Sequence, residues 1–248
     1  MIYRSNLTCP DLTPNFKRLV SRPMGHSFGH DVPSDWGDKA DDDPAFGIWK
    51  RCGLWTHDEA AILYNVAKSD GKFAHWADIG AHTGWTTAHL AAAATGRGNI
   101  DAVDPMLRLQ VWTERFEENL DQWWDSIAAV HYLRSDEYFQ ITNLGTFDGV
   151  CIDGCHEDGQ PQRDARNAAT HLAPTGVIML HDGVGRPVQD AVVWLMGQGF
   201  KARAYFTPHL VFCCWRGDFT PPDHVPDENV KSQLLDGRFS NFDFGKMS

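Results

Sequence analysis

The sequence lacks the features of several large protein classes. No stretch reaches the roughly 18 apolar residues that a membrane helix needs, and the first residues contain no apolar segment of a secretion signal. The six cysteines form no C-x-x-C pair, and Cys151 stands inside an apolar, strand-like run, which indicates reduced thiols rather than a disulfide framework. We therefore expect a cytoplasmic protein with no membrane partner.

Basic residues are also few. The 22 Lys and Arg are outnumbered by 33 Asp and Glu, which gives a formal net charge of −11. Because proteins that bind duplex nucleic acid rely on clustered Lys and Arg, we expect no nucleic-acid partner. What the chain does have is apolar material: 42% of its 248 residues are hydrophobic and ten are tryptophan, which is ample for a core.

The composition divides the chain into three parts. Residues 1–54 are rich in Pro, Gly, Asp and His without sustained periodicity, which predicts an irregular N-terminal extension. Residues 55–215 alternate between strand-like and helical patterns, which predicts one α/β domain. Residues 216–248 have few periodic positions, and we expect a tail that wraps the surface or joins an oligomer contact.

The most informative stretch runs from Trp76 to Met106. It begins as an apolar strand, turns through Gly80 and Gly84 into an alanine-rich helix, and returns as a second strand that ends at Asp104. Glycine lets the backbone turn tightly and approach a ligand, and an acid after the second strand can accept hydrogen bonds from both ribose hydroxyls. This pattern is typical of a nucleotide-binding β-α-β unit. Its turn reads G-x-x-x-G rather than the G-x-G-x-x-G that seats a pyrophosphate, which disfavours an NAD-dependent oxidoreductase.

The rest of the domain continues the alternation. A capping box of Thr56 and Glu59 predicts a helix that ends near Lys68. Further helices are expected at 107–124, 161–172 and from 187, and further strands at 127–132, 147–153, 177–180, 202–207 and 210–215. The short connection between the last two strands predicts an antiparallel hairpin. The fold class is therefore α/β: a Rossmann-like, seven-stranded, mostly parallel sheet with a C-terminal antiparallel hairpin and helices on both faces.

Several motifs resemble those of class I S-adenosylmethionine-dependent methyltransferases. The run D-I-G-A-H-T-G-W-T from Asp78 to Thr86 is similar to the first motif of that family, and Asp104 matches the acid after its second strand. Ser135-Asp136 resembles the pair that borders the adenine.

Two later blocks resemble one branch of the family, methyltransferase type 24. These blocks are I-D-G-C-H-E, which contains Asp153 and His156, and L-A-P-T-G-V-I-M-L-H-D, which ends in His181-Asp182. The branch includes small O-methyltransferases and cephalosporin hydroxylase-like relatives, and the resemblance covers about residues 55–215.

The resemblance implies S-adenosylmethionine as cofactor. The family's role for Asp78 is contact with the methionine end of the cofactor, and the competing interpretation is a carboxylate that caps the following helix. His82, inside the glycine turn, is expected to line the cofactor rather than to catalyse. The implied cofactor contacts are Asp78, Gly80, Ala81, His82, Gly84, Thr86, Asp104, Pro105, Ser135, Asp136 and Asp153.

The resemblance also implies a catalytic cluster. In metal-dependent members of the branch, carboxylates at the positions of Asp153 and Asp182 help to bind Mg²⁺, and a general base is proposed at the position of His156. We therefore expect His156 and Asp153 to be catalytic, and Asp153, His181 and Asp182 to hold Mg²⁺ or Mn²⁺. The competing interpretation of His156 is a loop imidazole that is hydrogen-bonded to a carboxylate such as Asp164.

His181 departs from the pattern of the branch, because a second acid is common at that position. An imidazole ligand favours a softer metal such as Mn²⁺ or Fe²⁺, or else His181 lies outside the ligand shell.

These observations predict a methyltransferase that uses S-adenosylmethionine to methylate an oxygen of a small hydroxylated acceptor, such as a sugar or a secondary metabolite. The alternative is a non-methylating relative that binds S-adenosylmethionine or S-adenosylhomocysteine in a structural or regulatory role. The expected partners are the small-molecule acceptor and a second copy of the chain. Acceptor specificity is expected in residues 1–55, the loop after Asp182 and the tail.

Overall fold

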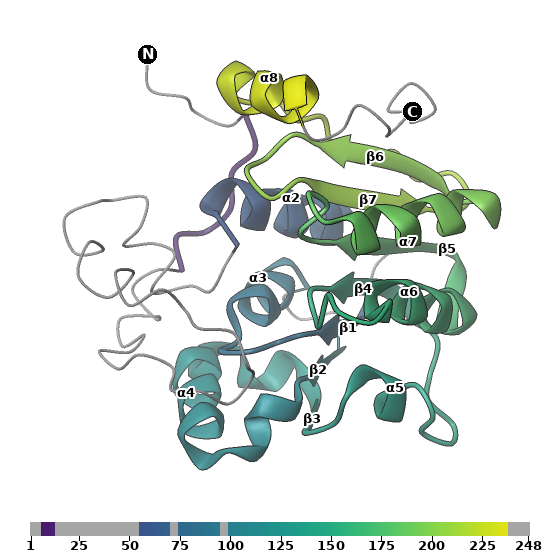
Figure 1. Ribbon diagram of the computed structural model, residues 1–248. Coiled ribbons are helices and arrows are strands. Elements are labelled where there is room, and N and C mark those ends of the chain that lie inside the picture. Colours follow the sequence, from purple (N-terminus) through teal and green to yellow (C-terminus); the bar gives the residue numbers. More distant parts are fainter. Residues whose placement is uncertain (1–5, 13–54, 70–73, 95–98, 238–248) are drawn as a thin grey trace.

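The computed structural model describes residues 6–12, 55–69, 74–94 and 99–237 (Figure 1). Most of the expected N-terminal extension, 13–54, lies outside the described residues, as does the end of the tail. In the described part, helices lie on both faces of one seven-stranded sheet. No helix within these ranges combines the length and apolar character of a membrane span.

The sheet has the expected topology. Its strand order is β3-β2-β1-β4-β5-β7-β6, and the first five strands in this order are parallel. Strand β7 is antiparallel to both β5 and β6, so it closes the C-terminal hairpin and also joins it to the rest of the sheet. The strands are β1 (His75–Ile79), β2 (Asn99–Val103), β3 (Ile127–His131), β4 (Phe147–Ile152), β5 (Leu172–Leu180), β6 (Lys201–Tyr205) and β7 (Val211–Trp215).

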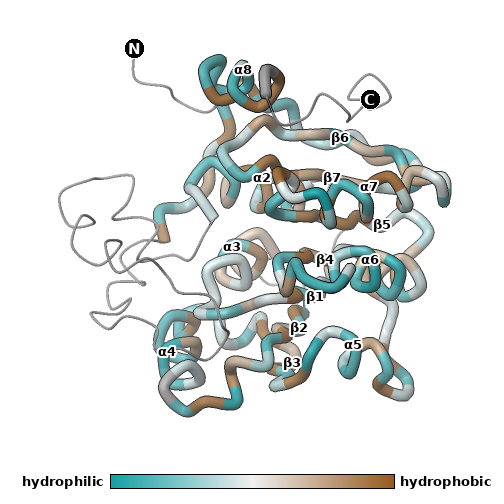
Figure 2. Tube along the Cα trace, viewed as in Figure 1, coloured by the Kyte–Doolittle hydropathy of each residue, from teal (hydrophilic) through white to brown (hydrophobic). Residues whose placement is uncertain are grey.

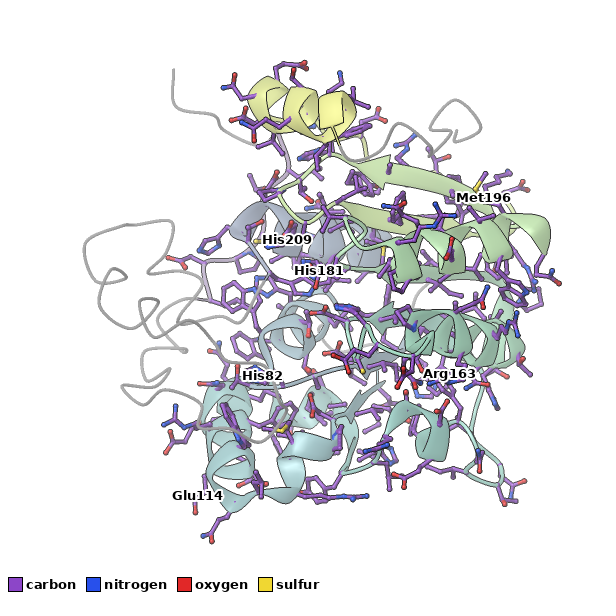
Figure 3. The ribbon with its side chains drawn as sticks, in the orientation of Figure 1. His82, Glu114, Arg163, His181, Met196 and His209 are labelled. Atoms are coloured by element: carbon purple, nitrogen blue, oxygen red, sulfur yellow. The ribbon has the colours of Figure 1, made fainter. Side chains whose placement is uncertain are left out.

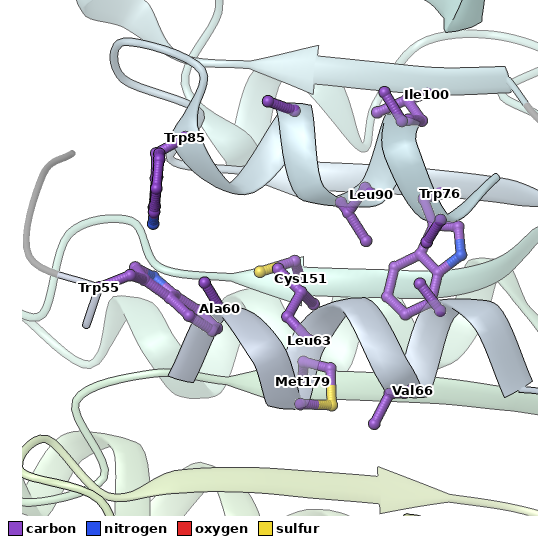
Figure 4. Packing of buried hydrophobic residues seen from close by; sticks show 14 of the residues in the cluster. Trp55, Ala60, Leu63, Val66, Trp76, Trp85, Leu90, Ile100, Cys151 and Met179 are labelled. Carbon is purple, nitrogen blue, oxygen red and sulfur yellow. The ribbon is translucent and has the colours of Figure 1, made fainter. Parts of the chain in front are cut away.

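The helices cover both faces because each central strand is buried on both sides. One core cluster joins Leu63 of α2 and Leu90 of α3 to Trp76, Cys151 and Met179 on the strands (Figure 4). A second cluster joins α6 and α7 to the alternate strand residues. The helices are α2 (His57–Lys68), α3 (Trp85–Ala93), α4 (Gln110–Leu120), α5 (Ser135–Tyr138), α6 (Gln160–His171), α7 (Arg186–Gly197) and α8 (Glu228–Gly237). Figure 2 shows the hydrophobic residues concentrated on the central strands, between more hydrophilic helices.

Strand alternation decides which side chains face which helices. Successive side chains of a strand point to opposite faces of the sheet, so Trp76 and Asp78 share the face covered by α2 and α3. Ala77 and Ile79 point to the face covered by α6 and α7. Asp78 therefore lies beneath the first turn of α3.

The expected helix after Trp55 is confirmed. Helix α2 begins with the predicted capping box, in which the Thr56 hydroxyl accepts a hydrogen bond from the Glu59 amide at 3.2 Å. The Glu59 carboxylate accepts one from the Thr56 amide at 2.7 Å. The box fixes the first turn of α2 and places Glu59 in it.

Two expected boundaries are wrong. Strand β5 begins at Leu172, five residues before the expected start at Val177, because Leu172 pairs with Phe147 across an irregular register. The helix expected over 107–124 is divided into the 3₁₀ helices Pro105–Arg108 and Asp121–Ser126 on either side of α4. The five cysteines within the described ranges are free thiols.

The described part of the tail lies against the N-terminal segment and α2. The amide of Val225 donates to Asn6 at 2.7 Å, and His224 lies 2.8 Å from Asp58. Helix α8 follows, and its Leu234 is buried in the second core cluster. The sequence pattern did not predict this helix.

Candidate functional site

The predicted site residues lie at or after the carboxyl ends of five parallel strands, which lie in the order β3-β2-β1-β4-β5. Backbone hydrogen bonds continue the sheet beyond these ends. Gly80 donates to Val103 at 2.9 Å, Asp153 to Ile79 at 2.8 Å, and His181 to Ile152 at 3.1 Å. The glycine turn, Asp153 and His181 therefore form one continuous edge.

The glycine turn is packed so tightly that it accepts only glycine at its first position. Gly80 has φ +92°, and a Cβ there would collide with the backbone carbonyl of Asp153. Gly84 has φ +89°, and its Cβ would meet Leu120 at 3.1 Å. Ala81 is buried between them. Backbone, rather than side chains, thus occupies the space between β1 and β4.

Asp78 is completely buried and only half satisfied. Its Oδ2 accepts hydrogen bonds from the hydroxyls of Thr86 at 2.7 Å and Thr87 at 2.6 Å. Its Oδ1 has no hydrogen-bond partner among the described residues. Burial raises the pKa of Asp78 to about 6, although the two hydroxyls and the weakly donating Cys151 thiol oppose that rise. The helix-cap interpretation is not supported, because Gly84 is the N-cap of α3 and Asp78 bonds hydroxyls. Oδ1 has acceptor capacity left, and the family's role for Asp78 at the methionine end of the cofactor stays a prediction.

Asp104 joins two turns. It accepts hydrogen bonds from the amides of His82 at 2.9 Å and Met106 at 2.8 Å, one on each carboxylate oxygen. Pro105 begins the 3₁₀ helix that Asp104 caps. Because each carboxylate oxygen has a second lone pair, Asp104 retains acceptor capacity for two more donors, as a ribose diol requires. The His82 ring packs 4.9 Å from Trp112, and burial lowers the pKa of His82.

Ser135 and Asp136 begin α5, after β3, and contact α6. Ser135 accepts a hydrogen bond from Gln160 at 3.1 Å, and Asp136 lies 3.6 Å from Arg163 in a largely exposed ion pair. No contact joins them to Asp153 within the described ranges, so their place beside the adenine stays a prediction.

The structure brings the three expected metal ligands together. Nδ1 of His181 lies 3.1 Å from Oδ1 of Asp153 and 3.5 Å from Oδ1 of Asp182. The candidate ligand atoms all lie within 4.8 Å of one another. Asp182 has φ +54°, a left-handed conformation that turns the chain at the end of β5. Two carboxylates and an imidazole are a donor set that suits a divalent cation.

His156 lies at the open side of this cluster. Its Nδ1 is 3.5 Å from Asp182 and its Nε2 is 4.0 Å from Asp153, and 37% of its side chain is exposed. The alternative partner Asp164 instead accepts from Gln160 at 2.8 Å. The imidazole therefore stands between the two carboxylates and solvent, as a base for an incoming acceptor must.

Three further residues complete the cluster, and the sequence did not identify them as functional. Trp55 donates its indole N–H to Asp153 at 2.7 Å and stacks on His181 at a ring distance of 4.4 Å. Glu59, which is fully buried, lies 3.4 Å from Nε2 of His181. His209, from the hairpin turn, lies 3.1 Å from Glu59, and Figure 3 shows it beside His181. Glu59 carried one signal, an acid at the start of an apolar helix, whereas His209 carried none.

The charges of this cluster depend on each other. Burial alone would raise the pKa of Glu59, but hydrogen bonds from His181 and His209 hold it well below its ordinary value. Burial alone would lower the pKa of His181, but Asp153, Asp182 and Glu59 raise it well above its ordinary value. Three carboxylates thus surround one buried imidazole, and the arrangement favours a cation at its centre.

One family model matches part of the chain. Residues 77–183 match the sequence profile of a family described as "Methyltransferase domain", methyltransferase type 24. No curated protein matches the chain significantly.

Solved structures share the fold. The O-methyltransferase TomG from Streptomyces achromogenes, in complex with S-adenosylmethionine, has a TM-score of 0.55 at 14% identity, over 66% of this chain and 82% of that one. An O-methyltransferase from Bacillus cereus, in complex with S-adenosylhomocysteine, has a TM-score of 0.56 at 14% identity, over 65% and 82%. At this identity the likeness shows the fold alone. Residues 77–183 thus match a methyltransferase family model, and the described part of the chain has the fold of solved O-methyltransferases that bind S-adenosylmethionine or S-adenosylhomocysteine.

Proposed function

We propose that the protein methylates an oxygen of a small hydroxylated acceptor, such as a sugar or a secondary metabolite. The observation that carries this proposal is the position of His156 beside Asp153 and Asp182, at the strand ends that adjoin the glycine turn. A base next to a pair of carboxylates suits the deprotonation of a hydroxyl group. That TomG is an O-methyltransferase of tomaymycin synthesis supports the same class of acceptor.

The side of the site at β1 and β2 would bind the cofactor. S-adenosylmethionine supplies a methyl group on a sulfonium, which an acceptor oxygen displaces in line. Oδ1 of Asp78 would accept from the ammonium group, and Asp104 from the ribose hydroxyls. Gly80 would keep the turn free of side chains where the cofactor approaches.

The side at β4 and β5 would activate the acceptor. Asp153, His181 and Asp182 would hold a divalent cation, Mg²⁺ or Mn²⁺, which lowers the pKa of a bound hydroxyl when it is present. His156 would take the acceptor's proton and share it with the carboxylates beside it. The stacked Trp55 ring excludes water from one face of His181.

Titration calorimetry with S-adenosylhomocysteine tests the cofactor half. We expect binding to the purified chain and a large loss of affinity in Asp104→Ala. Absence of binding, or unchanged affinity in the variant, contradicts this half.

Chelation tests the metal half. We expect chelator-treated protein to lose methyl transfer to a screened acceptor library, and to regain it with Mg²⁺ or Mn²⁺. Full activity in chelator contradicts the metal site while leaving the methyltransferase assignment intact.

The second candidate function is a non-methylating relative that binds S-adenosylmethionine or S-adenosylhomocysteine in a structural or regulatory role. The buried, cofactor-facing acids Asp78 and Asp104 suit it equally well, because they do not depend on the reaction. Bound cofactor without metal and without turnover on any acceptor would favour it.

A further inference from the structure

Glu59 is the hub of a buried network that the proposed reaction does not use. It lies in the first turn of α2, and its carboxylate faces two backbone N–H groups and two imidazole nitrogens. Oε2 accepts from the Thr56 amide at 2.7 Å, and Oε1 from the His209 amide at 3.0 Å. The two imidazoles lie at 3.1 Å (Nδ1 of His209) and 3.4 Å (Nε2 of His181). A carboxylate has about four lone-pair positions, so Glu59 is saturated.

This arrangement determines which ring nitrogen of His181 carries a hydrogen. Both oxygens of Glu59 accept hydrogen bonds from backbone amides, which can only donate, so each oxygen is fixed as an acceptor. The His181 nitrogen that faces it, Nε2, must then carry a hydrogen. The lone pair of His181 belongs to Nδ1.

Nδ1 of His181 faces two more acceptors, Asp153 at 3.1 Å and Asp182 at 3.5 Å. Nδ1 of His181 and the Oδ1 atoms of the two partly buried carboxylates therefore converge, and a cation among them, either a proton on Nδ1 or a metal ion, relieves their repulsion. Trp55 supports this arrangement from the other side, because it donates to Oδ2 of Asp153 and leaves Oδ1 directed at His181.

We propose that Glu59 is a positioning residue that holds His181 with Nε2 protonated, so that Nδ1 joins Asp153 and Asp182 as a metal ligand and the site prefers Mn²⁺ to Mg²⁺. The preference follows from the nitrogen ligand, since Mg²⁺ favours an oxygen shell and an imidazole suits softer ions. The proposal rests on the metal half of the proposed function.

The competing arrangement puts the metal between Glu59, His181 and His209, whose ligand atoms are also close enough to share an ion. The geometry disfavours it. Both oxygens of Glu59 are held by backbone amides that cannot move away, and both imidazoles already direct a nitrogen at it. His209 therefore orients Glu59, and Glu59 orients His181.

The pairing of Glu59 with His181 has a consequence for residue 181. A glutamate there would place a second carboxylate against the buried Glu59, and the two charges would repel. Replacement of both residues, Glu59→Gln with His181→Glu, removes the repulsion and gives a shell of oxygen ligands, which suits Mg²⁺.

The test is calorimetric titration of the full chain, freed of metal, with Mn²⁺ alone and with Mg²⁺ alone. We expect the native chain to bind Mn²⁺ more tightly, with a ¹⁴N coupling in the pulsed electron paramagnetic resonance spectrum of the bound Mn²⁺. Glu59→Gln should weaken Mn²⁺ about 10- to 100-fold, the usual effect of losing a residue that orients a histidine ligand. The amide keeps one acceptor oxygen for the capping box, so the helix start is preserved.

The matched control is Thr56→Ala, which removes the other half of the capping box and leaves Glu59 in place. It should lower thermal stability without changing Mn²⁺ affinity. If Glu59→Gln fails to fold, two variants decide the matter. His209→Phe keeps the ring and removes one donor to Glu59, and should weaken Mn²⁺ several-fold. His181→Glu should bind poorly alone and regain binding, with Mg²⁺ preferred, when combined with Glu59→Gln.

The outcomes separate the two proposals. A native chain that binds neither ion, or binds Mn²⁺ equally well after Asp182→Asn, overturns the metal half of the proposed function and this inference with it. A native chain whose Mn²⁺ site needs Asp182 but is unaffected by Glu59→Gln overturns only the role of Glu59. A ¹⁴N coupling from His209 would place the metal in the competing arrangement and overturn the inference as well.

Discussion

The two sides of the site are built differently. At β1 and β2, Asp78 and Asp104 accept hydrogen bonds from hydroxyls and amides that lie within 22 residues of them in the chain. At β4 and β5, His156 and His181 lie close in the chain to Asp153 and Asp182, but the cluster also joins groups that lie 28 to 150 positions apart. The first side is thus a local structure with neutral donors, and the second is a tertiary structure with titratable groups. In the proposed function, the first side would bind the cofactor and the second would activate the acceptor.

The largest expected effect is at Gly80, where the two sides of the site are in contact. Gly80→Ala forces a left-handed residue and drives its Cβ into the Asp153 carbonyl. We expect a loss of about 2–4 kcal/mol in the free energy of unfolding and no detectable binding of S-adenosylhomocysteine. Chemical denaturation and calorimetry measure both. Native stability would show that the turn and β4 are not in contact.

Asp182→Asn should separate the two sides. It removes one carboxylate from the cluster at β5 and leaves Asp78 and Asp104 untouched. We expect Mn²⁺ affinity to fall at least about 10-fold while S-adenosylhomocysteine affinity stays within about twofold. An equal loss of both affinities would show that the two sides act as one unit.

The pH dependence of Asp78 sharpens the comparison on the cofactor side. Burial raises its pKa from 3.8 to about 6 in the folded chain, so folding binds a proton there that the unfolded chain releases. Its contribution to stability is therefore full below about pH 4 and is lost as the pH rises through about 6. Relative to the native chain, Asp78→Asn should gain about 2–3 kcal/mol between pH 4 and pH 8. Urea unfolding of both proteins at the two pH values tests this, and a pH-independent difference contradicts it.

The affinity for S-adenosylhomocysteine should change with pH in the opposite direction to the stability. Its ammonium group would pair with the ionised Asp78, so its affinity should fall as the pH drops below about 6. Thr86→Val is the control, since it removes one hydroxyl donor to Asp78. We expect it to lower the free energy of unfolding by about 1 kcal/mol without abolishing the binding of S-adenosylhomocysteine.

The smallest expected effect is at Asp136. Its ion pair with Arg163 is largely exposed, so Asp136→Ala should change the free energy of unfolding by less than about 0.5 kcal/mol. If Asp136 borders the adenine, S-adenosylhomocysteine affinity should fall nonetheless. Unchanged affinity would remove Asp136 from the cofactor side.

What could be predicted from the sequence follows the same division. The seven strands, the hairpin and the acids at strand ends were predictable, because periodicity marks each strand and parallel strands end at one edge. The convergence of Asp153, His181 and Asp182 follows from that rule alone. Glu59 and His209 were not predictable as partners, because nothing local states that α2 and the hairpin turn lie against the end of β5.

The predicted start of β5 was wrong for a related reason. Pro174 and Gly176 indicated a break, but β5 continues through them because Leu172 pairs with Phe147. Pairing across the sheet overrode the local signal.

We also expect the position of the hairpin turn to influence the order in which contacts form during folding. His209 lies in the turn between β6 and β7, and its contact with Glu59 of α2 closes a loop of about 150 residues. The glycine turn needs only β1, β2 and β4. We therefore expect the glycine turn to form before the contact of His209 with Glu59 during refolding, so that pulsed hydrogen exchange protects the amide of Gly80 before that of His209.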